Sequence, residues 1–422
     1  MNGLKFNCNM AELEKKPRIL LINGYVYLPG EGGYKRTLYL FNMMKAQGYK
    51  VTLLTGDFNH YAKKVRDIDK FRLEYPDFND IEILHMPPYE KNVSVGRWKS
   101  GNVWANNVNN WLKDNYNGYD LIYAHMPDIP TILKIKQLCQ DKSLKLVIDI
   151  RDLWPEVFRV LLKREWLYKL ITYPIKKRAD KCYAAADELF AVSEEYLQRG
   201  LSVNTKSKNP IAVYIGATFD RFYDGIEKYA GIIKKGEDEI WVTYAGTLGS
   251  TYDLYTLLDA AAEIKRRGYD KILFKILGQG PESDKLKEYA LSKQIKNVEF
   301  VGFLEYEKMA AYLSKSDMTI NSVKRRASQS IINKVADYFA AGIPCLNGSL
   351  CKEMQRLIED YNAGLNFEPE NMNSLVDSIL SIVERPELAK EYGQNAKKLA
   401  SEKFDRSITY HNILNRLDAL MS

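Results

Sequence analysis

The sequence predicts an α/β protein with two doubly wound, Rossmann-like domains that face an interdomain cleft. The chain of 422 residues is too long for one ordinary core, because domains run roughly 100 to 200 residues. Short β-branched runs alternate with helical patterns, which is typical of parallel sheets covered by helices on both faces. A polar, helix-breaking stretch at residues 201–210 interrupts this rhythm, which then starts again.

The expected strands are short runs rich in β-branched and other apolar residues. In the first domain they are residues 18–23, 50–55, 120–123, 144–149 and 188–193, with a helix at 37–47 after the first strand. In the second domain they are residues 240–244, 272–277, 298–301, 318–321 and 343–346. We expect residues 1–205 to form the first domain and residues 206–400 to form the second.

The composition is that of a globular protein, with 46% apolar and 27% charged residues. No run of about 18 uncharged apolar residues occurs, so we expect neither a membrane-spanning helix nor a secretory signal. The five cysteines contain no CxxC pair and no even framework. We therefore expect no zinc site and no disulfide scaffold, and a reducing cytoplasm as the location of the protein.

The basic excess lies in the first half of the chain, which holds the whole formal net charge of +7. Residues 151–181 contain nine basic and four acidic residues, interleaved with aromatic and aliphatic side chains. Such a stretch suits an anionic membrane surface, with the consecutive Lys176, Lys177 and Arg178 as the contact group. The alternative is a helix of the domain whose charged side is solvated. Nucleic acid is not an expected partner, because no binding module is present.

Three glycine loops follow expected strands, and in open α/β sheets ligands bind beyond the carboxyl ends of the strands. Glycine lets the backbone approach an anion, and the next helix offers its N-terminal amides. The alternative for each loop alone is a simple turn. Together the loops favour a phosphorylated ligand, although none is a Walker P-loop. In chain order they contain Gly32 and Gly33, then Gly246, then Gly278 and Gly280.

Lys334 and Asp337 lie three residues apart on an expected helix and so share one face near its N-terminus, the end that favours anions. One cation for a phosphate and one carboxylate for two neighbouring ribose hydroxyls is an arrangement that suits a nucleotide sugar. The alternative is a surface ion pair between two neighbouring turns of the helix.

The segment that contains Lys334, residues 333–344, reads Asn-Lys-x-x-Asp-Tyr-x-Ala-Ala-Gly-x-Pro. It resembles the helix signature of retaining glycosyltransferases of family 4, in the branch similar to N-acetylfucosamine and other amino-sugar transferases of bacterial surface polysaccharide synthesis. Further motifs follow the family's order and extend the resemblance over nearly the whole chain. They are Gly32-Gly33-x-x-Arg36 and residues 149–155, 214–219, 244–249, 277–281 and 298–303.

This resemblance implies the GT-B fold, in which the first domain binds the acceptor and the second binds the nucleotide. It also implies that the last helix, residues 401–422, crosses back to the first domain. The implied donor site comprises Gly32, Gly33, Gly246, Thr247, Gly278, Gly280, Phe303, Leu304, Asn333 and Asp337. The implied catalytic residues are His125, Lys334 and Arg151. His125 aligns with the family histidine that contacts the donor sugar, and a purely structural histidine is the alternative.

No metal or other cofactor is expected. The reaction displaces a nucleoside diphosphate from a sugar, and fixed cations and backbone amides can stabilise that leaving group without a metal. The sequence offers no His/Asp cluster with the spacing of metal ligands. Asp67 and Asp69 form a DxD triplet, but they lie in a charged helical stretch, and we assign them to the surface.

Two departures from the family pattern concern the diphosphate. Gln329 stands where the first of two signature glutamates is expected, and Asp337 stands at the second. The loop at residues 247–251 lacks the Arg and Lys with which many relatives clamp the diphosphate. We expect Lys334 first and Arg151 second to replace this clamp, since a guanidinium is well shaped for phosphate. Both changes are interpreted as a subfamily trait.

The leading hypothesis is a retaining glycosyltransferase at the inner face of the cell membrane. It would move an acetamido or deoxyamino hexose from a UDP-sugar to a lipid-linked saccharide during assembly of a polysaccharide such as a capsule or O-antigen. One alternative is a nucleotide-sugar epimerase of the same two-domain shape. Another is a non-catalytic GT-B subunit that supports a partner transferase.

Overall fold

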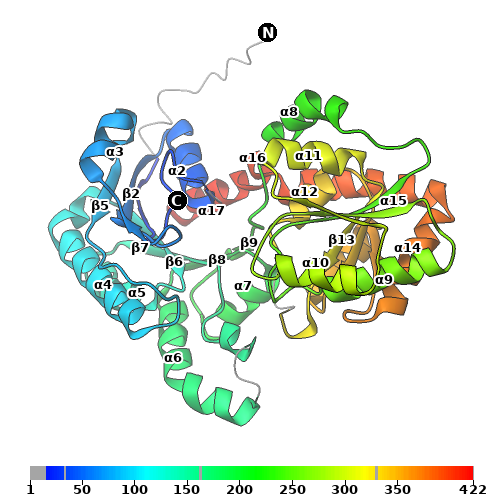
Figure 1. The fold of residues 1–422 in the computed structure, drawn as a ribbon. Coiled ribbons are helices and arrows are strands. Elements are labelled where there is room, and N and C mark those ends of the chain that lie inside the picture. Colours follow the sequence, from blue (N-terminus) through cyan, green and yellow to red (C-terminus); the bar gives the residue numbers. More distant parts are fainter. Residues whose placement is uncertain (1–15, 33–34, 161–163, 328–330, 422) are drawn as a thin grey trace, which may run out of the picture. The chain divides into compact units, whose positions relative to one another are not determined.

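The computed structural model describes residues 16–32, 35–160, 164–327 and 331–421. The chain forms two compact units, of which the first comprises Met1–Val213 and Tyr410–Ser422 and the second Tyr214–Thr409. Figure 1 shows that each unit contains one parallel sheet with helices on both faces, which is the α/β architecture that the sequence predicts.

The first sheet has seven parallel strands in the order β5-β2-β1-β6-β7-β8-β9. All five strands predicted for this domain are present, and β5 and β9 are additional. The strands are β1 (Arg18–Ile22), β2 (Lys50–Gly56), β5 (Ile81–Leu84), β6 (Leu121–Met126), β7 (Lys145–Ile150), β8 (Glu188–Ala191) and β9 (Ile211–Ala212). A small antiparallel hairpin, β3 (Phe58–Asn59) and β4 (Lys64–Val65), follows β2. Central strands such as β6 are buried along their whole length, as parallel strands covered on both faces must be.

Helices cover both faces of this sheet. Apolar side chains of α2 and α17 share one core with β1 and β2, while α4, α5 and α6 lie side by side. Asp67 caps α3 by accepting a hydrogen bond from the Lys70 amide, so this member of the DxD triplet starts a helix. The helices are α2 (Arg36–Ala46), α3 (Ile68–Glu74), α4 (Val95–Asn115), α5 (Ile129–Asp141), α6 (Glu165–Ala185), α7 (Glu194–Leu201) and α17 (His411–Met421).

The second sheet has six parallel strands in the order β12-β11-β10-β13-β14-β15. They are β10 (Ile240–Ala245), β11 (Ile272–Leu277), β12 (Val298–Gly302), β13 (Met318–Ser322), β14 (Cys345–Gly348) and β15 (Gly364–Asn366). The strands predicted for this domain are all present, and β15 is additional. As in the first sheet, the strand order reverses once, here between β10 and β13, which is the doubly wound arrangement.

Two cores flank the second sheet. One is formed with α9 (Leu254–Arg266), α10 (Ser283–Ser292) and α14 (Met372–Val383). The other is formed with α8 (Phe219–Tyr229), α11 (Tyr306–Lys315), α12 (Val335–Ala340), α13 (Lys352–Tyr361) and α15 (Pro386–Leu399). The short α16 (Arg406–Thr409) ends this unit.

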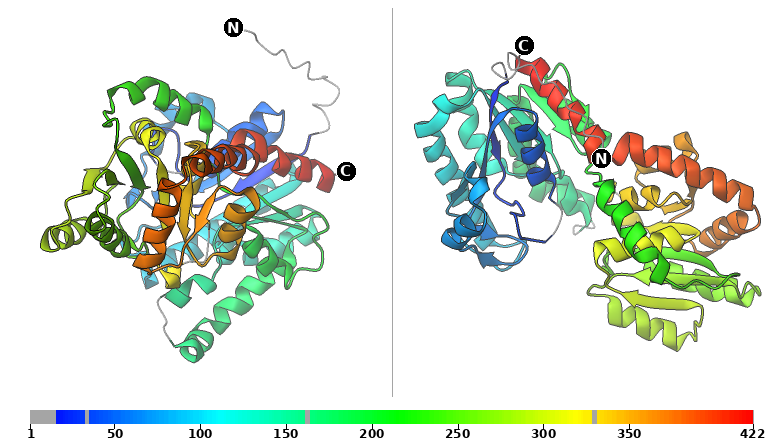
Figure 2. Two further views of the ribbon diagram at one scale, coloured as in Figure 1. Left: turned by 90° about the vertical axis from the view of Figure 1, so that its right-hand side faces the viewer. Right: turned by 90° about the horizontal axis from the view of Figure 1, so that it is seen from above.

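The chain passes from one unit to the other at positions that differ from the expected domain boundaries. The first unit continues to Val213, past the expected boundary at residue 205, because β9 pairs with β8 at Phe190 and Ile211. The expected last segment, residues 401–422, is divided. Its first part stays in the second unit, whereas α17 buries Ile413 and Leu417 in the core of the first unit, beside which Figure 2 shows it in red.

Where the chain enters the second unit, its backbone pairs with the segment that leaves it. The Ala217 amide donates to the Phe404 carbonyl at 2.9 Å, and the Arg406 amide donates to the Ala217 carbonyl at 3.1 Å. Gly216 has a φ of +60°, and a Cβ placed on it would lie 2.1 Å from the Phe404 oxygen. Only glycine fits this close approach of two backbones.

We predict that Gly216→Ala destabilises the protein by more than about 2 kcal/mol, since it adds a steric clash to the cost of a left-handed residue. The matched control is Gly268→Ala, because Gly268 has a φ of +86° but open space around its Cβ position. The control should lose only about 1 kcal/mol. Urea unfolding followed by circular dichroism measures both, and equal losses in the two variants would contradict the prediction.

Candidate active site

The strand order of each unit reverses at one place, between β1 and β6 in the first and between β10 and β13 in the second. In doubly wound folds ligands bind at the carboxyl ends of the strands beside such a reversal. His125 lies near the end of β6 and Gly246 directly follows β10.

In the second unit, Lys334 directly precedes α12 and reaches the end of β10. Its ammonium Nζ lies 3.8 Å from the ring centroids of both Tyr244 and Tyr252. The Nζ atom is buried, and no described residue accepts a hydrogen bond from it. Burial lowers the pKa of Lys334 well below its usual value. A buried ammonium without an acceptor is costly, and a bound anion would supply the missing partner.

The glycine loops of the second unit pack against one another. The Gly246 amide donates to the Leu277 carbonyl at 2.9 Å, and the Gly278 amide donates to the Gly302 carbonyl at 2.7 Å. A Cβ on Gly278 would lie 1.9 Å from the Gly246 oxygen, and one on Gly280 would lie 2.4 Å from the Leu248 oxygen. These glycines are thus required for loop packing, and their approach to a phosphate stays a prediction.

The other expected donor residues of this unit lie on or next to the same loops. Thr247 is exposed, and its carbonyl accepts a hydrogen bond from the Tyr244 hydroxyl at 2.8 Å. Phe303 follows β12 and is 60% exposed, which is unusual for a phenylalanine and leaves its ring face open to a ligand. Leu304 and Asn333 are half-buried.

Asp337 is buried in α12 and already has a protein partner. The Tyr306 hydroxyl donates to its Oδ1 at 2.7 Å. Burial raises the pKa of Asp337 to about 6, against the hydrogen bond from Tyr306 and the charge of Arg406, which lower it. Asp337 forms no ion pair with Lys334, so the surface ion pair considered as an alternative is wrong.

In the first unit, two guanidinium groups surround the fully buried carboxylate of Asp149 in β7. Arg151 donates through Nε to Asp149 at 2.9 Å, and Arg36 donates through Nη2 at 3.4 Å. Arg36 also donates to the Tyr410 hydroxyl at 2.8 Å. Burial would raise the pKa of Asp149, but the charges of Arg36 and Arg151 outweigh it and lower the pKa to about 2.

Arg151, expected as the second cation of the diphosphate clamp, is engaged within its own unit. Its Nε binds Asp149, and its Nη1 donates to the Thr37 hydroxyl at 2.7 Å. Among the described residues none accepts a hydrogen bond from Nη2 of Arg151, so this nitrogen can donate to a ligand. The sequence did not show that Asp149, two residues earlier on β7, would take up this charge.

His125 is buried near the end of β6, beside Asp149 in the sheet. Its Nδ1 lies 3.0 Å from the Ile22 carbonyl oxygen, so Nδ1 carries the proton and Nε2 is the free acceptor. Burial, together with the nearby charge of Arg151, lowers the pKa of His125 to about 3. The imidazole is therefore neutral at physiological pH and accepts rather than donates at Nε2.

Gly32 is exposed, with open space around its Cβ position. Gly33 and Gln329 lie outside the described residues.

Lys176, Lys177 and Arg178 are all exposed on α6, at the outer end of the first unit in Figure 1. Lys176 pairs with Asp180 at 2.9 Å. The first half of α6 also exposes four large apolar side chains, which a helix that serves only the domain core would not do. They are Trp166, Leu170, Ile171 and Tyr173, each at least half exposed.

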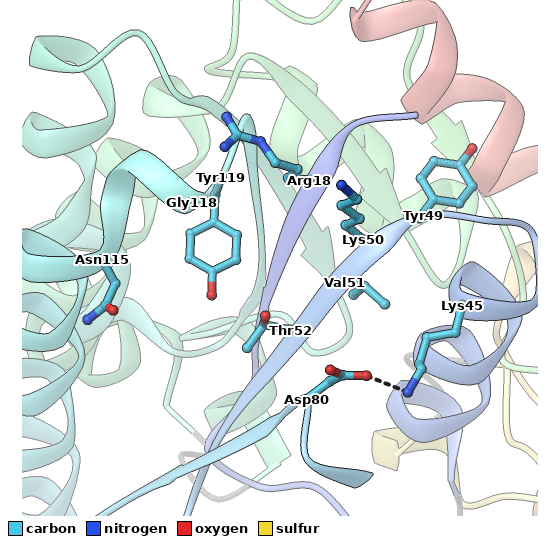
Figure 3. A pocket seen from close by; sticks show the side chains of 10 residues that line it. All are labelled: Arg18, Lys45, Tyr49, Lys50, Val51, Thr52, Asp80, Asn115, Gly118 and Tyr119. Carbon is cyan, nitrogen blue, oxygen red and sulfur yellow. Dashed lines mark hydrogen bonds and ion pairs between the residues drawn. The ribbon is translucent and has the colours of Figure 1, made fainter. Parts of the chain in front are cut away.

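The pocket in Figure 3 lies at the opposite edge of the first sheet, where β1 and β2 begin. It is lined by charged side chains, including Lys45 and Asp80, which form an ion pair. None of the predicted site residues lines it. Ligands of doubly wound sheets bind at the other edge, so this pocket is not part of the candidate site.

Within the described ranges, no helix has the length and apolar character needed to cross a membrane. No group of three or more His, Cys, Asp or Glu side chains in the same part of the chain is placed to hold a metal ion.

Comparison with known proteins assigns the second unit to a family. Residues 225–399 match the family model described as glycosyl transferases group 1. The second unit contains a glycosyl transferases group 1 domain. Over 359 residues the chain is 22% identical to an uncharacterized glycosyltransferase of Methanocaldococcus jannaschii, which covers 83% of this chain and 90% of the relative. These likenesses support glycosyltransferase activity.

Two solved structures share the fold of the whole chain. Sucrose-phosphate synthase from Thermosynechococcus elongatus is similar with a TM-score of 0.68 at 17% identity, over 96% of this chain and 99% of that one. HepE of Anabaena, in complex with UDP, is similar with a TM-score of 0.68 at 16% identity, over 95% and 100%. The predicted GT-B fold, with two Rossmann-like domains, is confirmed.

We predict that Asp337 makes the protein less stable as the pH rises. Its folded-state pKa of about 6 exceeds the usual unfolded value of about 3.9, so the folded state binds the proton more tightly. The resulting stability is present below pH 4 and is lost as the pH rises through 6. Asp337→Asn should therefore gain on the order of 2 to 3 kcal/mol relative to the wild type between pH 4 and pH 7.5.

Urea unfolding at the two pH values measures this difference. The matched control is Asp220→Asn, which replaces an exposed aspartate of the same unit and should follow the wild type. An Asp337→Asn variant with the pH dependence of the wild type would show that this carboxylate is not held in the environment described.

Proposed function

We propose that the chain is a retaining, metal-independent glycosyltransferase of family 4. It moves an acetamido or deoxyamino hexose from a UDP-sugar to a lipid-linked saccharide in surface polysaccharide assembly. The observation that carries the proposal is the buried ammonium of Lys334, which has no hydrogen-bond acceptor among the described residues and lies at the reversal of strand order in a region that matches glycosyl transferases group 1.

A UDP-sugar fits the groups at this edge of the second unit. Its diphosphate supplies the acceptor that Lys334 lacks, and the exposed ring of Phe303 offers a face for the uracil base. The Tyr306 hydroxyl uses one oxygen of Asp337, so the second oxygen can accept from the ribose hydroxyls. The complex of HepE with UDP supports this choice of nucleotide.

The proposed chemistry needs charge stabilisation at the leaving phosphate. As the bond between the anomeric carbon and the phosphate oxygen breaks, negative charge grows on the diphosphate and the sugar becomes oxocarbenium-like. Lys334, protonated when it meets the diphosphate, and the amides of the loops after β10 and β11 stabilise this charge. Nε2 of His125 accepts a hydrogen bond from a hydroxyl of the sugar. The acceptor hydroxyl attacks from the same face, and its proton passes to the leaving phosphate.

The surface of α6 supports a membrane-bound acceptor. Trp166, Leu170 and Ile171 expose apolar area beside the basic group Lys176, Lys177 and Arg178. Aromatic and aliphatic side chains next to lysine and arginine suit the interface of an anionic bilayer. We therefore place the enzyme at the cytoplasmic face of the cell membrane, where lipid-linked saccharides are accessible to it.

The decisive experiment incubates the protein with a panel of UDP-sugars and lipid-diphosphate saccharides in excess EDTA. We predict transfer with retention of the anomeric configuration and no dependence on added metal. Isomerisation of a sugar nucleotide without an acceptor would instead support the epimerase, and UDP binding without turnover would support a non-catalytic subunit. Loss of activity in EDTA with recovery in Mn²⁺ or Mg²⁺ would overturn the metal-free mechanism.

A second prediction concerns Lys334. Lys334→Met keeps the volume of the side chain but removes the charge, and should weaken UDP binding by about 10-fold to 150-fold, the equivalent of about 1.5 to 3 kcal/mol. Isothermal titration calorimetry measures this change. Lys287→Met, which replaces an exposed lysine of α10, is the control and should bind UDP as the wild type does. An unchanged affinity of Lys334→Met for UDP would show that the diphosphate does not bind at Lys334.

A third prediction concerns α6. Replacement of Lys176, Lys177 and Arg178 by Gln should weaken the affinity for phosphatidylglycerol vesicles by up to about 100-fold, since each basic residue contributes about 1 kcal/mol. Sedimentation with the vesicles measures this affinity. The control replaces three exposed lysines of the second unit, Lys287, Lys293 and Lys296, by Gln. Equal vesicle binding by both triple variants would show that α6 is a helix of the domain whose charged side is solvated and does not bind the membrane.

A further inference from the structure

A cluster of aromatic side chains lies on the loops at the carboxyl ends of the first sheet. These loops follow β1, β5 and β7 and form the turn of the β3–β4 hairpin after β2. We call this set the aromatic cluster. It consists of Tyr25, Tyr27, His60, Tyr61, Tyr89 and Trp154, with the cations Lys63 and Arg97 beside it.

The rings of the aromatic cluster other than Trp154 contact one another in a continuous series, and Arg97 lies between Tyr25 and Trp154. Tyr27 and Tyr61 stack with centroids 4.2 Å apart and planes at 12°. His60 lies 5.0 Å from Tyr61 and 5.0 Å from Tyr25, and its Nδ1 is hydrogen-bonded to the Tyr89 hydroxyl. These contacts bring three loops together and fix the orientation of the exposed rings.

The outer rings do not serve the hydrophobic core. Val26 and Leu28 are buried in the core of the first unit, whereas the alternate residues Tyr25 and Tyr27 point out of it and stay half exposed. Tyr61 is 54% exposed, although it stacks on Tyr27. Aromatic faces that are held rigidly and left open to solvent are typical of binding surfaces.

The cations beside the aromatic cluster are at most partly neutralised, since the charge of Asp152 acts on Arg97. The guanidinium carbon of Arg97 lies 5.8 Å from the ring of Tyr25 and 5.4 Å from that of Trp154, and Nζ of Lys63 lies 4.6 Å from the ring of Tyr89. Among described residues neither cation has a carboxylate oxygen within ion-pair distance. Arg97 donates to the Asn92 carbonyl, and Lys63 donates to Oδ1 of Asn92 and also contacts Nδ1 of His60 at 3.4 Å.

The aromatic cluster borders the candidate catalytic residues of the same unit. Burial raises the pKa of the Tyr61 phenol, and the nearby charge of Arg151 opposes this shift. Arg151 in turn binds Asp149, which lies beside His125 in the sheet. A molecule on Tyr61 would therefore lie next to the groups proposed to act on the sugar.

We propose that the aromatic cluster is the acceptor subsite and that it binds an anionic saccharide. The apolar face of a pyranose ring packs on Tyr61 and Trp154, and Arg97 and Lys63 hold a negative group of the saccharide, either a uronate or a phosphate. This inference rests on the proposed function, because it assigns the acceptor of that reaction. Sugar rings present C–H groups to aromatic faces, and incompletely neutralised cations select a negative charge.

The test compares three probes with one disaccharide core: cellobiose, cellobiouronic acid and cellobiose 1-phosphate. Binding to the full chain, saturated with UDP to occupy the nucleotide site, is measured by isothermal titration calorimetry. At least one acidic probe should bind about tenfold or more tightly than cellobiose. The tighter of the two acidic probes identifies the negative group as uronate or phosphate.

Two variants test the residues. Tyr61→Ala and Arg97→Gln should each weaken binding of the acidic probe at least about tenfold without a change in UDP affinity, which also shows that they fold. Their controls are Tyr116→Ala and Lys113→Gln, at the far end of α4 from Arg97. Both controls should bind the acidic probe as the wild type does.

Equal binding of neutral and acidic probes, or unchanged binding in Tyr61→Ala, would overturn the subsite. Its failure can be told apart from failure of the proposed function. Sugar transfer that proceeds with an unchanged acceptor KM in Tyr61→Ala would reject the subsite and leave the function standing. Probe binding that depends on Tyr61, in a protein that transfers no sugar, would support the saccharide subsite and reject the function.

Discussion

The arrangement of both units depends on one constraint of parallel sheets. A strand can be followed by a parallel neighbour only through a crossover, so the carboxyl ends of all strands in a sheet meet at one edge. This edge gathers loops that are distant in the sequence, as where Lys334 reaches Tyr244 across about ninety residues of chain. The described donor-site residues of the second unit and the expected catalytic residues of the first lie at these edges, because the helices that follow the strands begin there.

Charge is balanced differently at the two edges. In the first unit Asp149 is enclosed by Arg36 and Arg151, and its negative charge is satisfied before any ligand arrives. In the second unit Lys334 has aromatic faces on both sides, and no residue in the described part of the chain accepts a hydrogen bond from it. Tyrosine rings offset part of the cost of burying an ammonium, but they do not replace a negative group. The second unit is therefore the one whose electrostatics are completed by a ligand.

The sequence was most informative where structure is local. The short apolar, β-branched runs predicted the central strands, because a strand buried on both faces must be apolar throughout. It did not predict β9, which has two residues and exists only through pairing with β8. In the site, the sequence identified Lys334 and Asp337 as residues of interest but not their neighbours Tyr252 and Tyr306. Such partners are chosen by tertiary packing, which leaves no spacing pattern. No inference followed from the alternation of Tyr25 and Tyr27 with Val26 and Leu28 in the sequence, because only the structure shows which of the two pairs lies in the core.

The position of α17 affects the order in which the protein can be completed during synthesis. The core of the first unit includes Tyr410, Ile413 and Leu417, and the Tyr410 hydroxyl accepts a hydrogen bond from buried Arg36. These residues leave the ribosome after the whole second unit, residues 214–409, has been made. A nascent chain can therefore complete its second unit while the first still exposes an apolar face. That face is covered only when α17 docks, so the part of the chain made first is the last to be finished.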